Sequence, residues 1–126
     1  MDWLQIIGLV ALGVGIGIKL PKRDGMTPML FGSARRSAHW PKTRAEHLAK
    51  NPTCAACGTD QKLTVHHIKP FHINPELELD PNNLITLCEG VMNCHLRMGH
   101  LGNFRSYCVS IAEDAAIFLA KVQSRP

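Results

Sequence analysis

The hydrophobic positions of this 126-residue chain change their spacing along its length. Residues 3–18 are apolar with the single exception of Gln5. Residues 62–66 and 84–87 are short β-prone runs, and each predicts a strand. After Ser110, apolar residues recur at helical spacing, which predicts an amphipathic helix. These helical positions are Ile111, Ala115, Phe118, Leu119 and Val122. The pattern predicts an apolar N-terminal helix followed by a small α+β domain.

Residues that favour the starts and ends of helices set the bounds of the remaining elements. Pro41 suits the first turn of a helix that runs to about Lys50, where Asn51 and Pro52 end it. Residues 92–100 predict another helix. Ser110 and Glu113 have capping-box spacing at the start of the last one. We therefore divide the chain into an apolar segment (1–20), a linker (21–39) and a domain (40–126, with its core at 54–107).

The apolar segment predicts a single membrane-spanning helix. Sixteen to eighteen helical residues extend roughly 24–27 Å, close to what a bilayer core needs. Lys19, Lys22 and Arg23 follow it, and the positive-inside rule then places the downstream domain in the cytoplasm. Two other interpretations remain open: a helix packed on the downstream domain, or a signal-like start. The alternative location is the cytoplasm, without a membrane anchor.

Basic charge is concentrated beside this segment. Eight Lys or Arg and two acidic residues lie within residues 19–50, whereas the formal net charge of the whole chain is only +4. Such a stretch suits a phosphate backbone or an anionic lipid surface. An ordinary solvated linker would have a similar composition. His39 and His47, in the same region, are expected on solvated faces.

The odd count of five cysteines argues against a complete disulfide framework. Cys54 and Cys57 come from one tight turn, and Cys88 and Cys94 follow about thirty residues later. Two thiol pairs at such spacing predict a tetrahedral structural Zn²⁺ site that ties together segments with little core of their own. The alternative is two buried pairs without metal. Cys108 is expected to be a free thiol.

Histidines lie close to these thiols. His66 and His67 are adjacent at a strand end, so their side chains point to opposite faces. His95 follows Cys94 directly, which predicts a metal-ligand pair, His66 and His95, beside a free imidazole, His67. A neutral imidazole can activate water, and a divalent ion can relieve charge on a phosphate. Asn83 can orient His67 through hydrogen bonds.

His100 lies five residues after His95, about 140° around an ideal α-helix. It would complete the metal shell only if the helix ends or bends near Gly99, and it could equally contact phosphate.

The stretch VHHIKPFH…PELELDPNNLITLC…NCHLRMGH resembles the HNH nucleases, whose core is a ββα-metal finger, and in particular the zinc-bearing branch common in phages and mobile elements. The resemblance runs from Cys54 to about residue 107. It implies that His67 is the general base, that His66 and His95 bind the catalytic ion, and that Asn83 is the middle letter of the motif. It leaves out the apolar N-terminus.

These observations predict a metal-dependent endonuclease that acts on DNA with structural Zn²⁺ and with Mg²⁺ or another divalent ion at the catalytic centre. Lys69, Arg97 and Arg105 are candidate phosphate contacts. Residues 3–18 would contact the membrane, and a homodimer is one way to cut both strands. The alternative from another class is a catalytically silent zinc module that binds nucleic acid or a protein partner.

Overall fold

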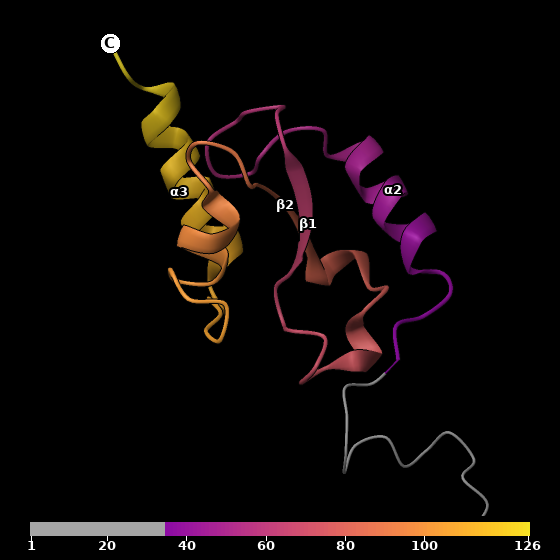
Figure 1. Cartoon of the computed structure of the whole chain (residues 1–126). Helices are drawn as coiled ribbons and strands as arrows, with labels where there is room; N and C mark the ends of the chain where they lie inside the picture. Colours follow the sequence, from indigo (N-terminus) through magenta and orange to yellow (C-terminus); the bar gives the residue numbers. More distant parts are fainter. Residues whose placement is uncertain (1–34) are drawn as a thin grey trace, which may run out of the picture. The chain divides into compact units, whose positions relative to one another are not determined.

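The computed structural model describes residues 35–126, which form a two-stranded sheet with helices around it (Figure 1). The elements in chain order are α2 (Trp40–Lys50), β1 (Leu63–His67), η2 (Pro75–Leu77), η3 (Pro81–Asn83), β2 (Leu84–Cys88), η4 (His95–Gly99) and α3 (Ile111–Gln123). This is the α+β arrangement that the sequence predicts. The apolar residues 3–18 lie outside the described part, so the predicted anchor stays a prediction. Within residues 35–126, no helix combines the length and hydrophobicity that a membrane span requires.

The sheet is an antiparallel pair in which Leu63 faces Cys88 and His67 faces Leu84. Both strands lie within one residue of their predicted bounds. All of β2 is buried, and β1 is buried from Val65 onward. In Figure 1 the sheet lies between α2 and α3. The two histidines of β1 therefore reach different neighbours on the two faces of the sheet.

The buried core is small, and cysteines form much of it. Leu87, Ile111 and Ala115 are fully buried, and the apolar stripe of α3 supplies the last two. Among residues 35–126, four of the nine buried residues in the main hydrophobic cluster are cysteines: Cys54, Cys88, Cys94 and Cys108. By contrast, α2 has no buried residue and is held through partly buried side chains. A domain with so little apolar core gains substantially from a structural metal.

The predicted helix over residues 92–100 is wrong in length and type. Asn93 has a left-handed backbone (φ 43°), and its side-chain oxygen accepts the amide of Leu96 at 3.3 Å. The helical segment begins only after Cys94 and makes a single π-helical turn, His95–Gly99. The left-handed backbone of Asn93 does not allow a regular α-helix to start earlier.

Two local predictions also fail. The Ser110 hydroxyl does not cap a backbone amide of α3; it donates to the carboxylate of Asp114 at 2.9 Å, so the capping box with Glu113 does not form. His39 is exposed as expected, but His47 is partly buried and its Nε2 atom has no hydrogen-bond partner among the described residues. The prediction of a solvated face therefore fails for His47.

Candidate metal centres and catalytic cleft

The four predicted zinc ligands come together. Cys54, Cys57, Cys88 and Cys94 lie with their sulfur atoms all within 4.8 Å of one another, and none forms a disulfide. The sulfur atoms of Cys57 and Cys88 are 3.6 Å apart. Tetrahedral Zn–S bonds of about 2.3 Å place sulfur atoms about 3.8 Å apart, so the donor set and spacing fit Zn²⁺. A metal can bind at this cluster, and zinc is the ion that four thiolates favour.

A second cluster consists of three histidines. His66, His95 and His100 bring ligand nitrogens within 4.8 Å of one another, and their ring centroids are 4.8–5.1 Å apart. His100 joins the cluster because η4 is a π-helical turn. The amide of His100 donates to the carbonyl of His95 at 3.1 Å, which closes a five-residue turn. Side chains five residues apart then lie on one face, whereas an α-helix would separate them.

Hydrogen bonds orient two of these imidazoles. Nδ1 of His95 donates to the Glu89 carboxylate at 3.0 Å, and Nδ1 of His100 donates to the carbonyl of Ser106 at 2.8 Å. In both rings, therefore, Nε2 carries no proton and has a lone pair available for a metal ion. Histidine ligands in metalloproteins have the same pattern of one nitrogen on the metal and the other on a carboxylate or carbonyl.

The third imidazole carries the strongest sign of a missing ligand. Nε2 of His66 is buried and has no hydrogen-bond partner among the described residues. A buried polar atom without a partner is costly, and a metal ion would satisfy it. Burial and the imidazoles of His95 and His100 lower the pKa of His66 to about 3. The ring is therefore neutral at physiological pH, which is the protonation state that a metal ligand needs.

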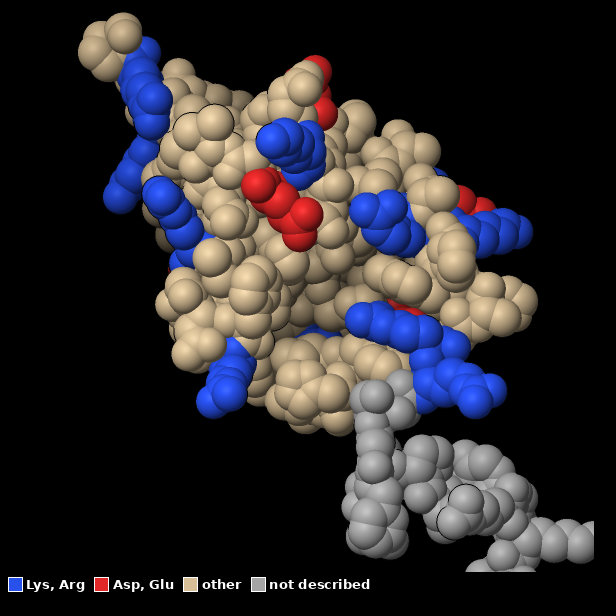
Figure 2. All heavy atoms as spheres, in the orientation of Figure 1, with Lys and Arg blue, Asp and Glu red and all other residues tan. Residues whose placement is uncertain are grey.

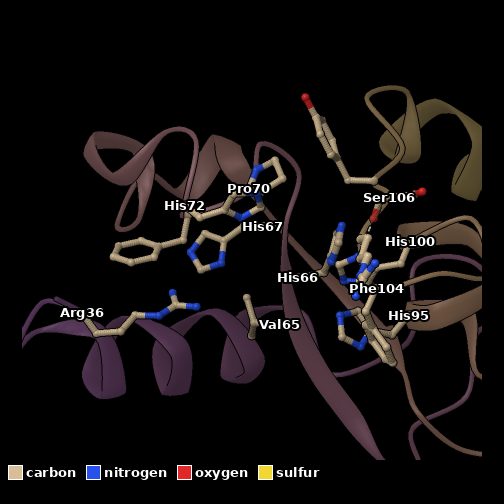
Figure 3. A pocket seen from close by; sticks show the side chains of 13 residues that line it. Arg36, Val65, His66, His67, Pro70, His72, His95, His100, Phe104 and Ser106 are labelled. Carbon is tan, nitrogen blue, oxygen red and sulfur yellow. Dashed lines mark hydrogen bonds between the residues drawn. The ribbon is translucent and has the colours of Figure 1, made fainter. Parts of the chain in front are cut away.

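His67 faces the other side of the sheet. Its Nε2 donates to the carbonyl of Glu78 at 3.0 Å, and its ring packs against the Trp40 ring at 4.6 Å between centroids, with the two planes tilted by 34°. A carbonyl only accepts hydrogen bonds, so Nε2 carries the proton and Nδ1 holds the lone pair. Burial lowers the pKa of His67, which keeps the imidazole neutral and able to accept a proton. Figure 3 shows His67 apart from the three clustered histidines, in the same cleft.

Sequence reasoning missed the residues that support His67. The carboxylate of Glu78 is buried, accepts the amide of Ser37 at 3.0 Å and pairs with Arg36 at 3.4 Å. The Arg36 guanidinium also lies 4.3 Å from the Phe71 ring centroid. Arg36 and Ser37 precede the predicted domain boundary, and their only sequence signal was the basic stretch around them.

Asn83 holds the loop that follows β1. Its side-chain oxygen accepts the amide of Lys69 at 2.8 Å. Its side-chain nitrogen donates to the carbonyls of Lys69 at 3.1 Å and Leu77 at 3.3 Å. The loop from Lys69 to Leu77 leads directly to Glu78. Asn83 therefore fixes the segment that presents the carbonyl to His67.

A cleft of about 400 Å³ joins the two histidine faces. Its lining includes His66, His67, His95, His100, Arg36 and Arg105. Figure 2 shows Lys and Arg side chains on both sides of the hollow in this face. Of the three candidate phosphate contacts, Arg105 lines the cleft, whereas Lys69 and Arg97 are exposed and outside the lining.

The fold and the site define a small α+β metal-binding domain with a thiol cluster beside a histidine-lined cleft. Residues 54–100 match the family model described as HNH endonuclease. HNH domains generally act as nucleases with divalent metals. No curated protein and no solved structure matches the chain.

Proposed function

We propose that this protein is a metal-dependent endonuclease that hydrolyses DNA phosphodiester bonds. The observation that carries the proposal is that two residues adjacent in the chain, His66 and His67, lie in different parts of the site. His66 joins a three-histidine cluster with an unpartnered buried nitrogen, and His67 lines the same cleft with its Nε2 bonded to the Glu78 carbonyl and its Nδ1 left to accept a proton. The HNH match over residues 54–100 supports the same conclusion.

In this proposal His67 is the general base. Its Nδ1 takes a proton from the attacking water, and the Glu78 carbonyl stabilises the resulting imidazolium through Nε2. Asn83 and Arg36 act indirectly, because they fix the loop and the carboxylate of Glu78. Arg105 in the cleft lining is the best placed of the candidate cations to contact the phosphate.

His66, His95 and His100 would hold the catalytic ion. Such an ion, when bound, relieves negative charge on the phosphate and stabilises the leaving oxygen. Three neutral imidazoles favour Zn²⁺, Ni²⁺ or a similar transition ion, whereas Mg²⁺ prefers oxygen ligands. We therefore propose a transition ion rather than Mg²⁺ at this centre, and Zn²⁺ at the four cysteines.

The test is cleavage of supercoiled plasmid DNA by metal-depleted protein after addition of Zn²⁺, Ni²⁺, Mn²⁺ or Mg²⁺. His67→Ala should abolish cleavage and leave the metal content unchanged. His39→Ala, at an exposed histidine, is the matched control and should cut at the wild-type rate. Cleavage by His67→Ala at the wild-type rate would show that the base is misassigned. Binding of DNA without cleavage under every metal would favour the silent zinc module.

We further propose that residues 3–18 tether the domain to the cytoplasmic face of a membrane, since the segment is apolar and basic residues follow it. Membrane fractionation of the full chain and of a variant that lacks residues 1–20 tests this proposal. One catalytic set per chain should give a nick in each event. A double-strand cut would require a second copy of the chain or a second event.

A further inference from the structure

Beside the metal histidines lies an exposed aromatic ring that the mechanism does not use. Phe104 is 64% exposed, although a ring of this size normally avoids water. Its centroid is 5.0 Å from that of His100 and 5.9 Å from that of His95. Figure 3 shows Phe104 next to these histidines, with Arg36 on the other side of the cleft. The ring therefore lines the cleft beside the histidine cluster.

Three hydrogen bonds hold the loop that presents Phe104. The Gly102 amide donates to the Leu96 carbonyl at 2.8 Å, and the Ser106 amide donates to the Asn103 carbonyl at 2.8 Å. The side chain of Asn103 also accepts the amide of Arg105 at 2.9 Å. A ring on such a loop loses little conformational entropy on binding.

The surroundings of Phe104 indicate what covers the ring. Arg105 is its neighbour in the chain, and both residues line the cleft with Arg36. Cations next to an exposed aromatic ring suit a polyanion that carries flat apolar groups, which describes a nucleic-acid strand. An apolar protein partner would leave the guanidinium of Arg105 in the interface without a partner of opposite charge.

We propose that Phe104 stacks on a nucleobase beside the cleavage site, so that the cleft prefers single-stranded DNA to a duplex. In a regular duplex both faces of each base are already stacked on neighbouring bases, and a protein ring gains contact only with a base that has left the stack. Stacking of a base on an aromatic side chain depends little on which base it is. The site would therefore distinguish single-stranded from duplex DNA, and not one base from another. This inference deepens the proposed nuclease function.

The test measures binding, so it does not depend on cleavage. Full-length His67→Ala protein is titrated with a short single-stranded oligonucleotide that carries a fluorescent adenine analogue, and with its duplex. We expect Phe104→Ala to weaken binding of the single strand about ten-fold and to leave duplex binding nearly unchanged. Phe104→Trp should retain tight binding of the single strand. Phe104→Leu should behave like the alanine variant, because it keeps an apolar group without a ring face.

Val109→Ala is the control, because Val109 is an exposed apolar residue outside the cleft lining. Equal losses for single strand and duplex in Phe104→Ala would overturn the proposal, and so would full binding by Phe104→Leu. If the plasmid assay shows no cleavage while the single-strand effect persists, the nuclease proposal fails and this one stands. If cleavage is found and the single-strand effect is absent, the reverse holds.

Discussion

The amide of His100 donates a hydrogen bond to the carbonyl of His95, 3.1 Å away, and this five-residue turn brings the two ring centroids to 4.8 Å. In an α-helix the same two side chains would point about 140° apart. Single π-helical turns are frequent at functional sites. Here the π-helical turn lets two histidines five residues apart in the chain share one metal ion, which a regular α-helix would not allow.

We predict that His100→Ala weakens metal binding at the histidine cluster by more than about 100-fold, because even the loss of a ligand's hydrogen-bond partner costs about 10- to 100-fold. Calorimetric titration of metal-depleted protein measures this affinity. His72→Ala is the control, since His72 lines the cleft but lies outside the metal cluster. Weaker DNA binding with unchanged metal affinity would instead make His100 a phosphate contact.

Gly99 permits the close approach of His66 to the π-helical turn. A Cβ atom at this position would lie 3.1 Å from Leu87 Cδ1 and 3.2 Å from His66 Cε1, and both side chains are buried. We expect Gly99→Ala to destabilise the domain by about 1–3 kcal/mol through overpacking and to weaken metal binding by displacing His66. Thermal unfolding and metal titration measure the two effects.

Gly90→Ala serves as the control for that substitution, because its Cβ would meet only the flexible Lys62 side chain at 3.8 Å. Equal melting temperatures for Gly99→Ala and wild type would contradict the packing argument.

The thiol cluster and the histidine cluster are joined at Cys94 and His95. We predict that Cys94→Ser, or removal of zinc by a chelator, abolishes nuclease activity and the cooperative unfolding transition, since zinc-binding energy in small domains is folding energy. Zinc content, circular dichroism and plasmid cleavage are measured together. Cys108→Ser changes a buried thiol outside the cluster and should keep its zinc. Full nuclease activity of protein without zinc at the cysteines would show that the histidine cluster does not depend on the thiol cluster.

His47 should make the domain sensitive to mild acid. Burial lowers its pKa in the folded protein below the usual 6.5, and its Nε2 has no partner among the described residues. As the pH falls below about 6.5, the unfolded chain binds a proton at this site before the folded chain does, so stability is lost. We expect His47→Leu to reduce the drop in melting temperature between pH 7 and pH 5. His39→Leu, at an exposed position, should leave that drop unchanged.

Local chemistry made much of this protein predictable from sequence. Alternation and β-branched residues predicted both strands to within one residue. The Cys54 and Cys57 pair, with Cys88 and Cys94, predicted the thiol cluster, because zinc ligands follow from residue type and spacing. The strand period of two also predicted that His66 and His67 lie on opposite faces of the sheet.

Tertiary structure decided what depended on long-range contacts or on rare backbone geometry. The left-handed backbone of Asn93 excludes a regular α-helix over residues 92–100, and only the π-helical turn that forms instead brings His100 into the cluster. Glu78 and Arg36 are 42 residues apart, and no local pattern predicts their pairing or the carbonyl that Glu78 offers to His67. Sequence determined which residues have the chemistry, and packing decided which atoms of them face the cleft, because orientation depends on partners distant in the chain.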